Sequence, residues 1–186
     1  MQLFGSFTSP FVRHCRIVLL ETGTACEFVE SDAQTSARQS PAQKLPFLKD
    51  GELLLTDSTS IIRHLREHAV QGFFPDIEDY DRFCLANTLL DAAVNLFMLE
   101  KDGITPEQSP YLQRQRNRID TCLEALAQCP LSDHPPYNDF ELRLGCVLAW
   151  SRFRQRFEFS QHPALTRFLE QMDQYDHFKH TAPPSS

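Results

Sequence analysis

Residues 44–62 have the sequence KLPFLKDGELLLTDSTSII, which places a proline, a turn dipeptide and a helix cap within one short span. Asp50-Gly51 lies between two apolar runs, and this dipeptide favours the positive φ angles of a type I′ turn between antiparallel strands. The stretch therefore predicts a β-hairpin. After the second strand, Thr56, Asp57 and Ser58 supply good N-cap chemistry and predict the start of a helix.

The beginning of this hairpin has the features of a binding edge for an extended peptide. Pro46 has no N–H, so it fits the first position of a strand only at a sheet edge or opposite something other than a neighbouring strand. If the Leu45–Pro46 bond is cis, the N–H and C=O of Leu45 point outward and can pair with a peptide. The helix start at Ser58 adds N–H groups that attract a carboxylate. The segment therefore offers a backbone edge beside an anion site.

The patterns before and after the hairpin predict a thioredoxin-like domain over residues 1–75. Ser9 and Pro10 begin its first predicted helix, and Gly23 supplies the C-terminal stop. The expected order of elements is β-α-β-α-β-β-α. Around the hairpin these are strands at 2–7 and 26–29, helices at 10–22 and 58–68, and an irregular helix in the polar loop 31–43.

No strand pattern follows the break at residues 72–76, so an all-helical C-terminal domain is expected over residues 79–180. Asn138, with Glu141 three residues later, predicts a capping box at the start of one of its helices. Residues 181–186 contain two prolines and are predicted to be a disordered tail. Apolar spacing places the helices at 80–101, at 111–127, from 138 and from 163.

Three motifs in this order resemble those of the soluble glutathione S-transferases. Residues 44–48 with the following hairpin and Asp57-Ser58 resemble the family's glutathione-binding segment. Residues 9–19 are similar to its N-terminal signature, and residues 138–145 to the capping box that opens the central helix of its helical domain. The motifs span most of the chain. The resemblance implies an α+β protein with a thioredoxin-like N-terminal domain followed by an all-α C-terminal domain.

The resemblance implies that Ser9 is the catalytic residue, donating a hydrogen bond to the glutathione sulfur and so lowering the pKa of the thiol. The pattern alone favours a helix N-cap without catalysis for Ser9, and Thr8 and Ser6 are close enough in sequence to be the donor instead. Thiol reductases of the family have a cysteine at this position. Ser9, with Val12 where a resolving cysteine would stand, therefore counts against dithiol chemistry.

The resemblance also implies how glutathione would be held as a co-substrate. Ser58 would bind the carboxylate of the γ-glutamyl end and Asp57 its amine, while Lys44 would pair with the glycyl carboxylate at the other end. The backbone of Leu45, ahead of Pro46, would pair with the cysteinyl unit. Capping alone also explains Asp57 and Ser58, and a lone lysine before a strand is commonly a solvated charge.

Composition limits the other possibilities. The net charge of −7 argues against nucleic acid or an anionic membrane as a partner, since both require a basic surface. The sequence has no signal-peptide pattern, which predicts a cytoplasmic protein. The six cysteines show neither CxxC nor Cys/His ligand spacing, so no metal site and no disulfide framework is predicted.

The predicted function is therefore that of a glutathione transferase, homodimeric and acting in detoxification, whose thiolate attacks a small electrophile. Two alternatives remain at this stage. One is a non-catalytic interaction module with the same fold, because fold alone does not fix function. The other is a glutathione-dependent reductase or isomerase, which keeps the ligand and changes the chemistry.

Several other side chains have ordinary explanations in the sequence. Five could line an apolar electrophile pocket or fill the core: Phe97, Met98, Trp150, Phe153 and Phe157. Three arginines alternate by two and are expected on solvated helix faces: Arg152, Arg154 and Arg156. His64 has no carboxylate at helical spacing and is expected at a surface. Arg13 and Arg16 are expected to face the helical domain or solvent.

Overall fold

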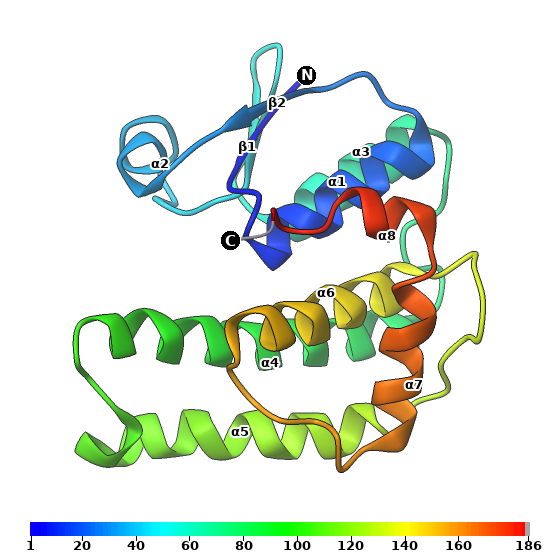
Figure 1. Ribbon diagram of the computed structural model, residues 1–186. Helices are drawn as coiled ribbons and strands as arrows, with labels where there is room; N and C mark the ends of the chain where they lie inside the picture. The colour runs from blue at the N-terminus through cyan, green and yellow to red at the C-terminus, as the bar shows by residue number, and fades with distance from the viewer. Residues whose placement is uncertain (185–186) are drawn as a thin grey trace. The chain divides into compact units, whose positions relative to one another are not determined.

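The computed structural model describes residues 1–184, which form two compact units (Figure 1). The first unit comprises Met1–Pro75 together with the chain from Asp173 onward, and the second comprises Asp76–Met172. The sequence assigned residues 79–180 to one helical domain. The structure differs from this because the C-terminal segment returns to the first unit.

The first unit has the predicted β-α-β-α-β-β-α order, and a short C-terminal helix is added to it. The four strands form one sheet in the order β2-β1-β3-β4, with β1 parallel to β2 and antiparallel to β3, and β4 antiparallel to β3. The elements are β1 (Gln2–Gly5), α1 (Pro10–Thr22), β2 (Glu27–Glu30), α2 (Ala33–Gln39), β3 (Phe47–Asp50), β4 (Leu53–Leu55), α3 (Ser58–His68) and α8 (Asp176–His180).

The core of this unit lies between the sheet and helices α1 and α3. Leu3 and Leu48 are opposite each other in the β1–β3 pairing and are fully buried. The periodic apolar residues of the two helices pack on them, as the helical spacing predicts. The core cluster consists of Leu3, Cys15, Val18, Leu48, Ile61, Ile62 and Leu65.

The hairpin turn differs from the predicted one by one residue. Asp50 pairs with Leu53, so the two-residue loop is Gly51–Glu52, and Gly51 alone of the two has a positive φ, +57°. Glycine at the first central position is typical of a type II′ turn, so the type I′ prediction for Asp50-Gly51 was wrong. Asp50 instead contacts His64, whose Nε2 lies 3.0 Å from Asp50 Oδ2, within hydrogen-bond distance. The expectation that His64 lacks a carboxylate partner was also wrong.

Strand β1 and helix α1 approach each other closely at Gly5. A Cβ atom added to Gly5 would lie 2.6 Å from both Cγ atoms of Val12. Valine has little χ1 freedom in a helix and cannot turn aside.

We therefore expect Gly5→Ala to lower the free energy of unfolding by about 2 kcal/mol, the scale of an overpacked core. Urea unfolding measures this change. Gly72→Ala is the matched control, since nothing lies within 4 Å of an added Cβ there. A Gly5→Ala variant as stable as the parent would contradict the close approach, and adding Val12→Ala to Gly5→Ala should recover part of the loss.

The second unit contains helices and no strands in its described residues. Helix α4 packs against both α5 and α6, and α6 against α7. Helix α4 is long and apolar enough, by composition alone, to cross a membrane, but its buried residues, such as Leu89 and Leu90, belong to the core of this unit. The elements are α4 (Ile77–Lys101), the short helix η1 (Pro106–Gln108), α5 (Pro110–Leu126), α6 (Asp139–Arg154) and α7 (Pro163–Met172).

The predicted capping box opens α6. The Asn138 side chain accepts a hydrogen bond from the Glu141 N–H at 2.9 Å, and Glu141 Oε2 accepts one from the Asn138 N–H at 2.9 Å. Glu141 Oε1 also accepts a bond from the Ser132 N–H at 2.6 Å, so one buried carboxylate fixes both the helix start and the preceding loop. This helix is buried along nearly its whole length.

Asn138→Ala should lower the stability of this unit by about 1 kcal/mol, because it leaves the Glu141 N–H without its acceptor. Thermal melting measures the loss. Asn117→Ala, on the exposed face of α5, is the control and should melt like the parent. If Asn138→Ala melts like the parent but loses activity, the capping interpretation is wrong.

The C-terminal segment is bound to helix α1, and Figure 1 shows α8 beside it. The Arg13 guanidinium lies 3.6 Å from the centroid of the Phe178 ring and donates to the Phe178 carbonyl at 2.8 Å. Arg16 donates to the Thr181 carbonyl at 3.2 Å. Arg13 and Arg16 therefore both contact this segment. Thr181 is buried, which contradicts a tail disordered from residue 181; residues 185–186 lie outside the described residues.

Candidate functional site

Three of the segments singled out from the sequence meet at one end of the sheet. Phe4 pairs with Phe47 in antiparallel β1 and β3, so the end of β1 lies beside the start of β3. Leu48 pairs with Leu55 in antiparallel β3 and β4, so the end of β4 lies there too. Ser9 follows β1, Leu45–Pro46 precede β3 and Asp57–Ser58 follow β4. The topology thus gathers residues that are up to 49 positions apart in the chain, from Ser9 to Ser58.

Ser9 is the N-cap of α1. Its Oγ accepts a hydrogen bond from the Val12 N–H at 3.4 Å, and Pro10 occupies the first turn of the helix. Within residues 1–184, no acceptor lies within hydrogen-bond distance of the Ser9 hydroxyl proton. The Thr8 hydroxyl is instead 3.2 Å from that of Ser6. Of the hydroxyls that the sequence left open, those of Ser6 and Thr8 are hydrogen-bonded to each other, whereas that of Ser9 accepts a backbone N–H.

The backbone before β3 has the form that an added peptide strand requires. The Leu45–Pro46 bond is cis, as expected from the sequence. Neither backbone polar group of Leu45 is hydrogen-bonded within the described part of the chain. Leu45 is half-buried and Pro46 buried, so the pairing groups of Leu45 are presented at the end of an ordered strand.

Asp57 caps helix α3 and also forms an ion pair with Lys44. Its Oδ1 accepts a bond from the Thr59 N–H at 2.8 Å, and its Oδ2 lies 2.8 Å from Lys44 Nζ. Partial burial opposes ionisation, but the hydrogen bonds from Lys44 and Thr59 outweigh it and lower the pKa of Asp57. The sequence placed Lys44 and Asp57 at opposite ends of a ligand. In the structure they contact each other, because the strand order brings the two segments together.

Ser58 is the first residue of α3 and is only 6% exposed. The Cys15 thiol lies 3.9 Å from the Ser58 carbonyl, within reach of a weak S–H hydrogen bond. Cys15 belongs to the core cluster, and its contact fixes the start of α3 against α1. Nothing in the local sequence pattern pointed to this role for Cys15.

The structure does not activate Cys26, Cys122 or Cys129 as nucleophiles. All six are free, and three of them, including Cys15, are buried. Desolvation by burial raises the pKa of Cys26, Cys122 and Cys129, which keeps these thiols protonated at neutral pH. Within residues 1–184, no three His, Cys, Asp or Glu side chains are grouped as metal ligands.

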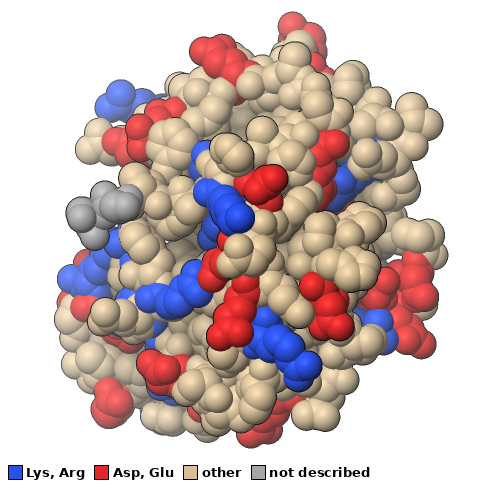
Figure 2. Space-filling view, turned by 45° about the vertical axis from the view of Figure 1, so that its right-hand side comes forward, with Lys and Arg blue, Asp and Glu red and all other residues tan. Residues whose placement is uncertain are grey.

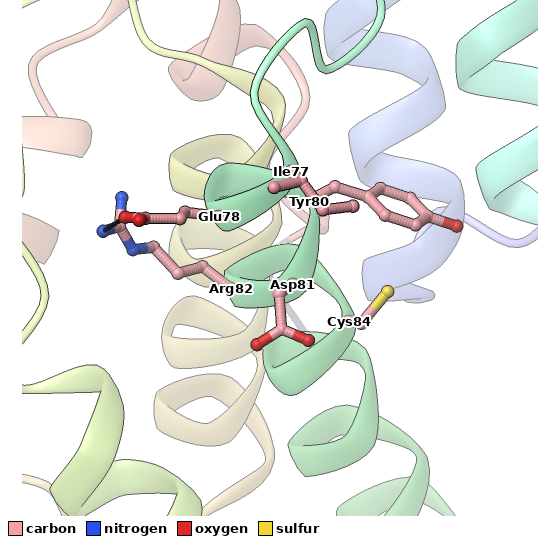
Figure 3. A pocket seen from close by; sticks show the side chains of 6 residues that line it. All are labelled: Ile77, Glu78, Tyr80, Asp81, Arg82 and Cys84. Atoms are coloured by element: carbon pink, nitrogen blue, oxygen red, sulfur yellow. Dashed lines mark hydrogen bonds and ion pairs between the residues drawn. The ribbon is translucent and has the colours of Figure 1, made fainter.

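A hollow of about 560 Å³ lies against the first two turns of α4. Figure 3 shows Glu78 and Arg82, which form an ion pair, on one side of the helix, and Tyr80 and Cys84 on the other. Ile77, which also lines the hollow, is 75% exposed. The lining has an apolar part but no arrangement of acid, base and nucleophile, and sequence reasoning did not identify it.

The surface carries no continuous basic region on the face drawn in Figure 2. Lysine and arginine side chains are interspersed there with aspartate and glutamate. This distribution is consistent with the net charge of −7. This face therefore lacks the continuous positive surface that binds a nucleic-acid backbone.

Known proteins resemble the chain in both sequence and structure. Residues 3–72 match the family model for the glutathione S-transferase N-terminal domain. The Escherichia coli (strain K12) protein described as the uncharacterized GST-like protein YibF is 26% identical over 204 residues, covering 100% of each chain. A glutathione S-transferase from Methylobacillus flagellatus KT, solved with GSH bound, superposes with a TM-score of 0.84 at 26% identity, over 98% of this chain and 99% of that one. A glutathione transferase family member from Pseudomonas fluorescens Pf-5, with bound glutathione, gives 0.85 at 25% identity, over 99% of each chain.

Proposed function

The chain belongs to the glutathione S-transferase family, and from this premise we propose that it is a cytoplasmic glutathione transferase. In this proposal it binds glutathione as a co-substrate at the end of the sheet where Ser9, Leu45 and Ser58 meet. It holds the thiol as a thiolate for attack on a small electrophile. The relatives solved with bound glutathione support the choice of ligand.

The open backbone of Leu45 would pair with the cysteinyl unit of glutathione, which places the sulfur toward α1. Ser58 would bind the γ-glutamyl carboxylate at the start of α3, and Asp57 would bind the amine. Lys44 would bind the glycyl carboxylate only after leaving Asp57. Both side chains of this pair are about half exposed, at 58% and 49%, and exposed pairs contribute about 0–1 kcal/mol, so the exchange is inexpensive.

The catalytic part of the proposal rests on the Ser9 hydroxyl, whose proton has no acceptor within residues 1–184. Ser9 Oγ already accepts the Val12 N–H, which fixes the oxygen and leaves its proton to be donated. A thiolate placed there would receive that hydrogen bond and would also lie at the positive end of the α1 dipole. Both interactions favour the thiolate over the thiol and lower its pKa.

The reaction would be nucleophilic attack by this thiolate on an electrophilic carbon. In a substitution, the C–S bond forms and the leaving group departs with the electron pair of its bond to carbon. In an addition, the electron pair moves to the far atom of the activated double bond, which takes a proton from solvent. The protein's own contribution is the positioned, ionised sulfur.

We also propose that the chain is a homodimer, formed through the exposed apolar side chains at the start of α4. Ile77 is 75% exposed and lies next to Tyr80 in the lining of the hollow. Burying this apolar surface against a second copy would stabilise a symmetric pair. Ile77→Glu should convert the dimer to a monomer in sedimentation analysis, whereas Val70→Glu, at another exposed apolar residue, should not. A monomeric parent would overturn this part of the proposal.

The test of the proposed function is retention on immobilised glutathione, elution with free glutathione, and then turnover of chlorodinitrobenzene. Retention with turnover is the expected result. A protein that neither binds glutathione nor turns over the arene would instead be an interaction module with this fold. Retention without conjugation, but with glutathione-dependent reduction of a disulfide, would assign the reductase chemistry.

A further inference from the structure

Three cations surround one aromatic side chain where α4 and α6 end. The Phe97 ring centroid lies 4.5 Å from Lys101 Nζ, 5.6 Å from the guanidinium carbon of Arg154 and 5.2 Å from that of Arg156. Phe97 also meets Trp150 edge-on at 5.7 Å. All three cations are within the roughly 6 Å over which a ring face attracts a positive charge. We call these five residues the cation–aromatic cluster.

The cluster is strongly positive for an acidic protein. Within the described residues, the cluster forms one ion pair, in which a terminal nitrogen of Arg156 lies 2.5 Å from Glu100 Oε2. Lys101 and Arg154 have no carboxylate partner in residues 1–184. Three positive charges therefore face one negative charge, in a chain whose net charge is −7.

Arg154 is held by aromatic rings and not by hydrogen bonds. Its guanidinium carbon lies 4.7 Å from the Phe153 ring as well as near Phe97, and the side chain is half-buried. Its Nε is buried with no hydrogen-bond partner in the described structure. The terminal N–H groups of Arg154 therefore have no acceptor within residues 1–184. The planar, forked arrangement of these groups fits a carboxylate.

Helix electrostatics explain only part of this arrangement. Lys101 lies in the last turn of α4 and Arg154 in the last turn of α6, where positive charge is favoured. That effect needs a charge near the helix end, and an extended, fully hydrated side chain would satisfy it. It does not explain why the side chains converge on one ring or why the buried Nε of Arg154 lacks a partner. The expectation that Arg154 lies on a solvated face was wrong.

We propose that the cation–aromatic cluster binds an organic anion with a flat apolar body. The carboxylate would bind the terminal N–H groups of Arg154 with Lys101 nearby, and the body would pack on Phe97. Binding of this anion does not depend on the proposed transferase function, so it is tested without glutathione.

Binding is measured without glutathione, through the fluorescence of Trp150, which is the single tryptophan of the chain and contacts Phe97. The probes are para-nitrobenzoate and para-nitrobenzamide, which differ in charge and hardly in shape. We expect the anion to bind about tenfold more tightly than the amide, as for one added charge-assisted hydrogen bond, and to weaken as salt is raised. Equal binding of the two probes, or binding of neither, would overturn the proposal.

Arg154→Gln should weaken para-nitrobenzoate binding by about tenfold and leave the amide unchanged, and Arg154→Lys should lie between the parent and this variant. Arg114→Gln is the matched control. Arg114 also lies over a ring, 5.7 Å from the Tyr111 centroid, but it is exposed and on α5. Unchanged amide binding shows that the variant is folded. Equal losses in Arg154→Gln and Arg114→Gln would overturn the assignment.

Discussion

Phe178→Ala is expected to lower the free energy of unfolding by about 3–5 kcal/mol, the range for removing a fully buried phenylalanine. Phe178 is 0% exposed, although it belongs to a helix of only five residues near the end of the chain. Its ring covers the guanidinium of Arg13, which is itself 6% exposed. The substitution therefore opens a void and also removes the ring that faces a buried charge.

The loss should appear in the first unit because the segment around Phe178 is bound there by two further contacts. Arg13 Nε donates to Thr181 Oγ1 at 3.4 Å, and the Tyr175 hydroxyl donates to Glu21 at 2.7 Å. Glu21 in turn forms a largely buried ion pair with Arg66 at 2.6 Å. The C-terminal segment thus connects to both α1 and α3, the two helices that carry Ser9 and Ser58 at their starts.

Urea unfolding followed by circular dichroism measures the effect. Lys179→Ala is the neighbouring control, since its side chain is half exposed and should change stability by less than about 0.5 kcal/mol. A Phe178→Ala variant within 1 kcal/mol of the parent, on the scale of a surface change, would mean that the segment is not part of the folded unit.

The elements that could be predicted are those with local signals. Ser9-Pro10 and the Asn138 to Glu141 spacing each report a helix start within four residues, and both caps are present in the structure. Helix α8 has no such signal, because Phe178 is its one buried residue and no periodicity can be seen in Asp176–His180. Its position depends on a contact with Arg13, 165 residues earlier, which no local pattern encodes.

The candidate site likewise combines features that local sequence patterns predicted with contacts that they did not predict. The hairpin motif identified Leu45, Asp57 and Ser58, because cap and strand-edge chemistry are local properties. The turn register was missed, since the pairing of Asp50 with Leu53 is set by the whole sheet and not by the Asp-Gly dipeptide. The contact between Lys44 and Asp57 was missed for the same reason. The hydrogen-bond partners of the Ser9 and Thr8 hydroxyls could not be predicted either, because they depend on the local fold.

Ser9→Ala is expected to keep glutathione affinity within a few fold and to lose turnover. The ligand's ends would be held by Leu45, Asp57 and Ser58 with Lys44, whereas Ser9 would touch only the sulfur. A hydrogen bond to a charged group contributes roughly 1.5–3 kcal/mol, so the pKa of the bound thiol should rise by about one to two units. The rate at neutral pH should fall by about 10- to 150-fold.

The direction of the pH dependence identifies the cause. In its proposed role, Ser9 would lower the pKa of the bound thiol by stabilising the thiolate, so its loss should move the pH–rate profile to higher pH. The variant should therefore regain much of its rate above the raised thiol pKa, where the thiolate forms without the hydroxyl. Thiolate absorbance of the glutathione complex against pH measures the same shift without turnover.

Ser9→Ala also removes a helix cap, which costs about 1 kcal/mol of stability whatever its catalytic role. Ser109→Ala controls for this, because Ser109 is likewise an N-cap followed by proline, and its Oγ accepts the Tyr111 N–H at 3.3 Å. We expect both variants to lose similar stability and only Ser9→Ala to lose turnover. Thr8→Ala should retain turnover, since the Thr8 hydroxyl is bonded to Ser6. If Thr8→Ala raises the thiol pKa and Ser9→Ala does not, Thr8 is the donor and the serine assignment is wrong.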